Sequence, residues 1–345
     1  MNDHPMTRRG VLKAIAGTGA AGALSGVLAG CATKQSTTMA RTPPAASRQR
    51  ALRLAHMTDF HIQPEKGAGE GSARCLHHVQ SLADKPSLII TGGDHIMDGV
   101  EKEEARTREL WELWARTVRN DCSIPVRHAL GNHDIWGWNK GKSKTTGSEA
   151  RWGKQWALDA LGEPSRYYSF DRSGWHIVVL DSIHVHPENP SGYIGKLDDP
   201  QFDWLERDLA AASRAGGPPV MVVSHIPILS AIVLVPRISK GDDQLASKGV
   251  QMARDIPAGL MHVDAHRLRM LFRQNPNVKL CLSGHLHRTD RVDYEGVTYL
   301  CSGAVSGSWW DGPNDLTREG YNVVDLYSDG TFGYEYIEYG WTARA

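Results

Sequence analysis

Short apolar runs that end abruptly in polar residues recur along the chain and predict buried β-strands. We expect such strands at residues 52–58, 87–91, 124–130, 219–223 and 278–282. Apolar residues at helical spacing occupy much of the sequence between them, most clearly over 101–119. Further helices are expected through the seventies and over 149–161, 201–212 and 262–273. Alternating strands and helices are typical of the α/β class.

The last part of the chain changes to mostly strands. A hairpin is expected from 167–170 and 175–180, and short strands follow at 291–294, 297–301, 321–327 and 332–337. Two sheets packed face to face with helices outside would satisfy this order. A single doubly wound sheet is the alternative, but the β-rich end fits it less well. We therefore expect one domain over residues 51–340.

Residues 226–260 interrupt this pattern with scattered proline and glycine and only patchy apolar content. A segment of this length without regular structure is usually either a functional lid or disordered. Both interpretations are open from the sequence.

The first thirty residues differ in composition from the rest. A basic pair, Arg8-Arg9, precedes an Ala/Gly-rich run over 14–30 that is too short and too weakly apolar for a comfortable membrane span. This layout is typical of an export signal, which we place at residues 1–31. It resembles the twin-arginine type, which is read by the twin-arginine export machinery.

Residues 28–31 resemble a lipoprotein processing box, so that a lipidated Cys31 would tether the mature chain to a membrane. Simple cleavage near this point and an uncleaved anchor are the alternatives. Residues 32–50 are rich in Thr, Ser, Pro and Gln, and we expect a flexible linker there. These features predict an exported protein, either periplasmic or a membrane-anchored lipoprotein.

Composition narrows the class of partner. Lys plus Arg and Asp plus Glu both total 39, so the balanced charge indicates neither a nucleic acid polymer nor an acidic partner. No CxxC pair occurs, which argues against a zinc ribbon or a redox motif. Beyond Cys31, four cysteines remain: Cys75, Cys122, Cys281 and Cys301. Cys281 and Cys301 lie in predicted buried strands and are expected to be free core thiols, although export would permit a bridge.

Polar side chains follow five of the predicted strands, where open α/β sheets place their ligands. The groups are two carboxylates, one amide and four imidazoles: Asp59, Asp94, Asn132, His61, His225, His285 and His287. Mixed oxygen and nitrogen donors suit first-row transition ions such as Mn, Fe or Zn. Seven ligands are too many for one tetrahedral site, but a carboxylate that bridges two ions accounts for them. Two such ions activate a hydroxide for in-line attack at phosphorus, and His133 is then available to protonate the leaving oxygen.

The five blocks resemble, in order, the signature blocks of the calcineurin-like metallophosphoesterase superfamily. They are Asp59-x-His61, Gly93-Asp94, Gly131-Asn132-His133-Asp134, His225 and Gly284-His285-x-His287, and the match covers about residues 52–302. The resemblance implies a four-layer α/β/β/α sandwich with two mixed sheets. It also implies two metal ions of divalent or trivalent charge and a small phosphoester substrate.

Site roles follow from the same resemblance. The first metal would be held by Asp59, His61, Asp94 and His287. The second would be held by Asp94, Asn132, His225 and His285. His133 would contact the phosphate and act as general acid, and Asp134 would orient it.

Two departures narrow the resemblance. Met97 stands where purple acid phosphatases have a tyrosine ligand, so an iron–tyrosinate site is not expected. Met97-Asp98 precedes Gly99 where the phosphoprotein phosphatases have Asp-Arg, which weakens a Ser/Thr protein phosphatase interpretation. What remains resembles the bacterial branch with class III cyclic-nucleotide phosphodiesterases and assorted phosphomonoesterases.

For the other histidines and for one tryptophan pair, structural roles are expected or remain an alternative. A structural role is expected for His56, His128, His176, His184 and His186. His95 lies next to Asp94, and both substrate contact and a structural role are open. The pair Trp309-Trp310 can either stack on a base or aryl leaving group or pack in the interior.

Three functions agree with these observations. The first is hydrolysis of small phosphate mono- or diesters outside the cytoplasm. The second is hydrolysis of phospholipid or glycolipid headgroups of the envelope, favoured by the tether and the apolar stretch 228–235. The third is a metal-loaded binding protein without catalysis, against which the intact His133 argues.

Overall fold

The computed structural model describes residues 48–214, 216–235 and 256–344 of the chain. The predicted export signal, Cys31 and nearly all of the predicted linker lie outside the described residues. The same holds for residues 236–255 of the predicted irregular segment. In the described part, no helix has both the length and the apolar character needed to cross a bilayer.

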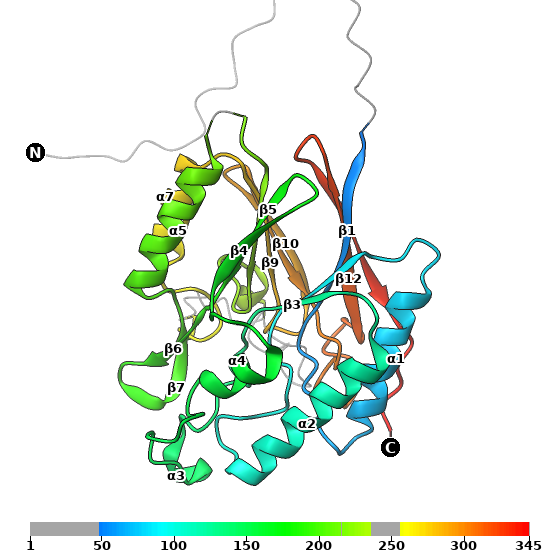
Figure 1. Cartoon of the computed structure of the whole chain (residues 1–345), viewed down its shortest axis with the longest axis vertical. Helices are drawn as coiled ribbons and strands as arrows, with labels where there is room; N and C mark the ends of the chain where they lie inside the picture. The colour runs from blue at the N-terminus through cyan, green and yellow to red at the C-terminus, as the bar shows by residue number, and fades with distance from the viewer. Residues whose placement is uncertain (1–47, 215, 236–255, 345) are drawn as a thin grey trace, which may run out of the picture. The chain divides into compact units, whose positions relative to one another are not determined.

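Two β-sheets lie face to face in the body of the molecule (Figure 1). The five-stranded sheet has the order β13-β12-β1-β2-β3. Its strands are β1 (Arg50–Met57), β2 (Leu88–Thr91), β3 (Val126–His128), β12 (Gly320–Tyr327) and β13 (Phe332–Glu338). β1, β2 and β3 are parallel to one another, whereas β12 and β13 pair antiparallel on the other side of β1.

The six-stranded sheet has the order β10-β11-β9-β8-β5-β4. Its strands are β4 (Tyr168–Arg172), β5 (Trp175–Leu180), β8 (Val220–Ser224), β9 (Val278–Ser283), β10 (Thr289–Tyr294) and β11 (Val297–Ser302). The four central strands are parallel, and the two edge strands are antiparallel. Both sheets are therefore mixed.

Alternation along each strand divides the core into three layers. In β1, Leu54 faces the core between the sheets while Ala55 faces the outer core of the first sheet. In β5, Val179 and Val178 divide in the same way between the central core and the outer core of the second sheet. Successive strand side chains point to opposite faces, so sheets that are apolar on both faces need a helical cover on the outside.

Helices supply that cover and complete the predicted four-layer sandwich (Figure 1). The first sheet carries α1 (Ala68–Ser81), α2 (Glu104–Asp121) and α4 (Gln155–Leu161). The second carries α5 (Asp199–Ala212) and α7 (Ala265–Gln274). Two shorter elements are α3 (Lys140–Ser143) and the single turn η1 (Ile232–Leu234). In α2, the buried side chains Leu110, Trp111 and Trp114 form the predicted stripe.

One helix is shorter than predicted. The helix expected over 149–161 begins only at Gln155. Just before it, Gly153 exchanges two backbone hydrogen bonds with Trp136, at 2.9 and 2.8 Å. Because these bonds use the backbone groups that a helix would need, the first turns of the predicted helix cannot form.

One hairpin was not predicted. β6 (Ile183–His186) and β7 (Asn189–Gly195) form a separate two-stranded sheet. Pro187, Pro190 and Gly192 hide the strand pattern in the sequence. The hairpin is fixed at Gly195, whose N–H donates to the Ala258 carbonyl and whose carbonyl accepts from Val263, both at 2.8 Å.

The four cysteines of the described part are free thiols, which confirms the prediction made for Cys281 and Cys301. At the carboxyl end, Tyr339 and Trp341 are buried against α1 and α2 in the outer core of the first sheet. The packed body therefore includes the last residues of the predicted domain and the adjoining Trp341.

Candidate metal centre

The loops that leave the parallel strands bring all seven predicted ligand residues together. Asp59 and His61 follow β1, Asp94 follows β2, and Asn132 follows β3. His225 follows β8, while His285 and His287 follow β9. Because parallel strands end at one edge of a sheet, the two sheets present these loops to one another.

The potential ligand atoms form a row of three overlapping triads, each with its atoms within 4.8 Å of one another. The triads are Asp59–His61–His287, His61–Asp94–His133 and Asp94–His225–His285. His61 links the first two, and Asp94 links the last two. Asn132 joins the row through its Oδ1 atom, which lies 3.0 Å from His225 Nε2.

The spacing within the row fits metal ligands. His61 Nε2 and His287 Nε2 are 3.0 Å apart, and His287 Nε2 is 3.2 Å from Asp59 Oδ1. Asp94 Oδ2 lies 3.5 Å from His61 Nε2 and 3.3 Å from His225 Nε2. Ligand bonds of about 2.0–2.2 Å put neighbouring donor atoms about 3.0–3.5 Å apart around one ion. Asp94 Oδ2 therefore lies within this spacing of a histidine from each end triad.

Main-chain carbonyls fix the orientation of three imidazoles. His225 Nδ1 lies 2.7 Å from the Gly92 carbonyl, and His287 Nδ1 lies 2.5 Å from the Gly307 carbonyl. His133 Nδ1 lies 2.5 Å from the Met97 carbonyl. A carbonyl only accepts, so each Nδ1 carries a proton, and in His225 and His287 this leaves Nε2 facing the cluster.

Two further ring nitrogens are buried without a hydrogen-bond partner among the described residues, His61 Nδ1 and His285 Nε2. Buried polar atoms are normally paired, so orphaned atoms in a native site call for an explanation. The donor set of carboxylates, one amide oxygen and inward-facing imidazoles fits two transition-metal cations.

The electrostatics of the cluster also favour cations. Burial alone would raise the pKa values of the Asp59 and Asp94 carboxyls, but the adjacent histidines outweigh burial and hold both pKa values below the ordinary range. Burial lowers the pKa of His61 to about 4 and that of His285 to about 3. For His225, burial is outweighed by Asp94, which raises its pKa to about 9. The carboxylates thus create a negative potential that either a proton on His225 or a metal cation would neutralise.

Backbone strain is concentrated at the same place. In the described part of the chain, twelve residues other than glycine have positive φ, and seven of them lie in or beside the cluster: Asp59, His61, Asp94, His285, His287, Trp309 and Trp310. Each such conformation costs about 1–3 kcal/mol and persists only where the surroundings impose it. This pattern marks the cluster as a functional site.

Two glycines allow the loops to approach so closely. A Cβ atom on Gly131 would lie 2.1 Å from both N and Oδ1 of Asp94. A Cβ atom on Gly284 would lie 2.3 Å from Asp59 Oδ2. Any side chain at either position would push a carboxylate out of the cluster.

His133 lies at the exposed side of the row and is only partly buried. Its ring centroid is 4.6 Å from that of His61, and its N–H donates to Asp94 Oδ1 at 2.8 Å. With Nδ1 bound to the Met97 carbonyl, Nε2 is the ring nitrogen that remains for another partner.

The predicted orienting role of Asp134 requires a correction, because its carboxylate contacts the neighbouring loop and not the His133 ring. It accepts from the backbone N–H groups of Gly131, at 2.9 Å, and His95, at 2.8 Å. It also lies 2.9 Å from His95 Nδ1. Asp134 therefore ties the loop after β3 to the loop after β2, and the Met97 carbonyl orients His133. Backbone carbonyls leave no signal in the sequence.

His95 does not approach the substrate side. It is fully buried, with Nε2 2.6 Å from Thr91 Oγ1 and its ring packed against Trp114. Four of the histidines expected to be structural make hydrogen bonds outside the cluster: His56 with Ser302, His128 with Thr91, His176 with Asp171 and Asp208, and His186 with Glu188.

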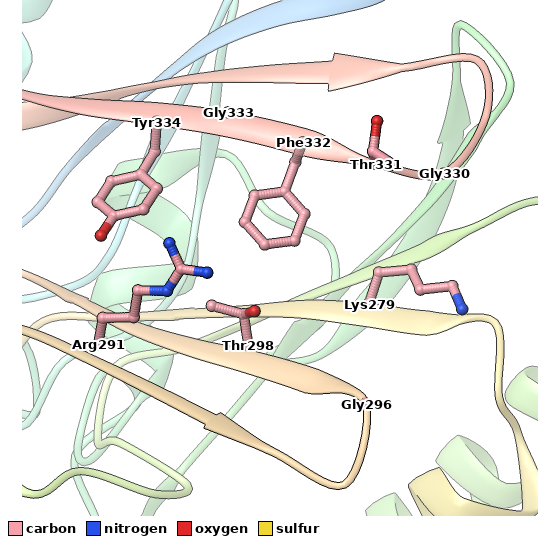
Figure 2. A pocket seen from close by; sticks show the side chains of 9 residues that line it. All are labelled: Lys279, Arg291, Gly296, Thr298, Gly330, Thr331, Phe332, Gly333 and Tyr334. Atoms are coloured by element: carbon pink, nitrogen blue, oxygen red, sulfur yellow. The ribbon is translucent and has the colours of Figure 1, made fainter. Parts of the chain in front are cut away.

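A cavity of about 530 Å³ lies at the other end of the sandwich (Figure 2). Phe332 and Tyr334 on β13 point across it toward Arg291 and Thr298. Lys279, at the start of β9, also lines it, whereas His285 follows the end of that strand. This cavity is therefore separate from the metal cluster.

The fold and the cluster define an α/β metalloprotein whose ligands lie on loops at the carboxyl ends of two sheets. The chain belongs to the calcineurin-like phosphoesterase family, whose profile matches residues 52–289. Members of this family include phosphatases and phosphodiesterases, and the chain is a metallophosphoesterase.

Two curated relatives illustrate the range. Serine/threonine-protein phosphatase CPPED1 of Homo sapiens is 25% identical over 245 residues, which cover 70% of this chain and 67% of that protein. The 3',5'-cyclic adenosine monophosphate phosphodiesterase CpdA of Escherichia coli is 22% identical over 308 residues, covering 84% of this chain and 90% of that protein. A dimetal phosphatase from Danio rerio shares the fold, with a TM-score of 0.53, 15% identity and coverage of 85% of this chain and 100% of that chain.

Proposed function

We propose that the protein hydrolyses phosphate monoesters or diesters with two first-row transition ions, Mn, Fe or Zn, held by the row of triads. Asp59, His61, Asp94 and His287 would hold one ion, and Asp94, Asn132, His225 and His285 the other. The observation that carries this proposal is the position of Asp94 Oδ2 between His61 Nε2 and His225 Nε2, at 3.5 and 3.3 Å. Two such ions supply Lewis acidity and a nucleophile from water at neutral pH.

His133 is the group of this chain that would move a proton. Its Nδ1–H is fixed on the Met97 carbonyl, so Nε2 would hold the proton and deliver it to the leaving oxygen. The backbone bond from His133 to Asp94 keeps the ring at a set distance from the bridging carboxylate. Asp134 would act indirectly, by holding the loop after β3 against the loop after β2.

A panel of esters on protein reconstituted with Mn, Fe or Zn tests the proposal. p-Nitrophenyl phosphate and bis-p-nitrophenyl phosphate separate monoesterase from diesterase action. Cyclic AMP and a phosphoserine peptide are included because relatives carry the names of a cyclic AMP phosphodiesterase and a protein phosphatase. We expect turnover of at least one nitrophenyl ester. Full metal occupancy with no turnover of any ester would favour the alternative of a metal-loaded binding protein.

A lipid headgroup substrate is the second candidate. Its support is the surface around η1, where Leu234 and Val235 are each 52% exposed at the end of the apolar stretch. If this surface meets a lipid aggregate, Leu234→Ser with Val235→Ser should reduce turnover of a micellar phospholipid more than turnover of p-nitrophenyl phosphate. Equal turnover of the micellar substrate by parent and variant would reject this candidate.

We further propose that the chain is exported through the twin-arginine pathway and tethered by a lipidated Cys31. The support is the sequence pattern of residues 1–31. Cys31→Ala should move the protein from the membrane fraction to the soluble fraction, and replacement of Arg8-Arg9 by Lys-Lys should block export. An unchanged soluble fraction in the Cys31 variant would refute lipidation.

A further inference from the structure

Two aromatic rings stand beside the metal cluster, one at each end of the row of triads. The Trp309 ring lies 4.6 Å from the His287 ring and 6.0 Å from the His61 ring, measured between centroids. The Tyr193 ring lies 5.9 Å from the His285 ring, nearly perpendicular to it at 82°. His287 belongs to the first triad and His285 to the third. Both aromatic side chains are only partly buried, so part of each ring faces the outside.

Trp309 is held in this position by its neighbour. Trp310 is buried, and its Nε1 donates to the carbonyls of Phe60 and His61 at 3.0 and 3.1 Å. Gly71 of α1 makes room for it, because a Cβ there would lie 2.2 Å from the Trp310 ring. Both tryptophans have positive φ, 51° and 73°, which is unfavourable for bulky side chains. The strained turn places Trp310 in the core and Trp309 beside the cluster. From the sequence, interior packing and stacking on a base or aryl group were both open for this pair, and the structure gives interior packing to Trp310.

Tyr193 is held by the unpredicted hairpin. Its strand β7 is tied at Gly195 to residues 258 and 263. A Cβ atom on Gly259 would lie 3.1 Å from the Tyr193 ring, so the glycine lets that segment pack on the ring. Burial, together with the charges of Asp94 and Asp59, raises the pKa of the phenol well above its ordinary value. The hydroxyl therefore stays protonated over the working range of pH.

We propose that Trp309 and Tyr193 are two aromatic walls of the substrate cleft and select phosphoesters that carry a flat aromatic ring near the phosphate. This inference rests on the proposed phosphoesterase function. A phosphate placed at the cluster has its substituent at the exposed side, where the two rings stand. Flat rings gain stacking or edge-to-face contacts with such walls, and a saturated ring of similar size gains less. The competing role is that the two rings only hold His287 and His285 in place.

A matched pair of esters tests the proposal on the metal-reconstituted chain. 2-Phenylethyl phosphate and 2-cyclohexylethyl phosphate have nearly the same leaving group, so they differ mainly in the flatness of the ring. We expect the parent to prefer the phenyl ester in kcat/KM by on the order of tenfold, and Trp309→Ala or Tyr193→Ala to cut that preference by about threefold each, mainly through KM. Trp309→Phe and Tyr193→Phe keep a ring and should keep most of the preference.

Binding supplies a readout apart from turnover. The Kd values of 2-phenylethylphosphonate and 2-cyclohexylethylphosphonate, measured by calorimetry, should show the same order and the same loss in the alanine variants. Tyr294→Ala is the control, because this ring is 45% exposed at the far end of β10. Adenosine 5'-phosphate against ribose 5-phosphate then shows whether the ring that is recognised can be a nucleobase or only an aryl group.

Each outcome decides something. A parent that hydrolyses both matched esters without preference overturns the inference and leaves the proposed function intact. Alanine variants that lose metal and lower both esters equally assign the rings to holding the histidines, which also overturns it. Turnover of neither matched ester and neither nitrophenyl ester overturns the proposed function, and the inference with it.

Discussion

The two ends of the sandwich differ in whether their charged side chains are buried or exposed. At the carboxyl ends, Asp59 and Asp94 are buried among histidines on strained backbone. At the other end, Arg291 pairs with Asp293 at 2.8 Å, and both side chains are about half exposed, at 46% and 57%. Exposed pairs of this kind contribute at most about 1 kcal/mol, whereas buried charges without partners are very costly. The comparison indicates that buried charge and backbone strain are concentrated at the end of the sandwich where a bound ligand can offset their cost.

The Asp94 carboxylate, which we propose as the bridge between two ions, gives the largest expected effect. Asp94→Asn removes the charge that links two triads, so we expect loss of both ions and a fall in kcat/KM on the order of 10³-fold. Bound metal by elemental analysis and turnover of p-nitrophenyl phosphate measure it. Asp293→Asn makes the same change at the other end and should keep full activity. Retention of both ions by the Asp94 variant would remove the bridge from the proposal.

His133→Ala should come next. The ring is not needed to hold the end triads, so most of the metal should remain while turnover falls about 10²–10⁴-fold. The loss should be greater for an alkyl phosphate than for p-nitrophenyl phosphate, because a poor leaving group needs the proton more. Equal losses for the two esters would contradict the general-acid role.

A single methyl group tests how tightly the loops are packed. Gly131→Ala places a Cβ 2.1 Å from the Asp94 carboxylate and should lower the free energy of unfolding by about 1–3 kcal/mol, with weaker metal binding. Gly141→Ala in α3 meets nothing closer than 3.8 Å and should be neutral or stabilising by up to about 1 kcal/mol. Denaturant unfolding of both variants makes the comparison. Similar stabilities would mean that the loop after β3 moves easily.

The smallest effect is expected at the start of β5, away from the cluster. Hydrogen bonding to Asp208 raises the pKa of His176, with Asp171 adding to it against burial. A raised pKa in the folded state stabilises the protein fully below the unfolded pKa of about 6.5 and ceases to do so as pH rises through the folded value. His176→Gln should therefore lower the free energy of unfolding by at most about 1 kcal/mol at pH 5.5 and hardly at pH 9. Asp208→Asn should remove the same pH dependence; an equal deficit of the His176 variant at both pH values would show that packing, not charge, is lost.

The sequence was most informative where one rule decided the structure. Apolar runs followed at once by Asp, Asn or His predicted both the strands and the residues that meet at their ends, because strand direction fixes where the loops lie. It was least informative where the backbone itself supplies the contact, as with the Met97 and Gly307 carbonyls. The hairpin that carries Tyr193 was missed because its proline and glycine residues resemble a loop. Trp309 and Trp310 could not be distinguished, since their directions depend on two φ angles.

The contact between His61 and His287 joins positions 226 residues apart along the chain. If two ions bind as proposed, three of the four residues assigned to each ion are synthesised before the fourth, which is His287 for one ion and His285 for the other. Tight loading must then be among the last events of maturation, after β9 has docked on β8 and the two sheets have met. A chain truncated before His285 would keep Asp59, His61 and Asp94 but would lack β12 and β13 of the first sheet as well as His287, so we expect it to release any ion it captured.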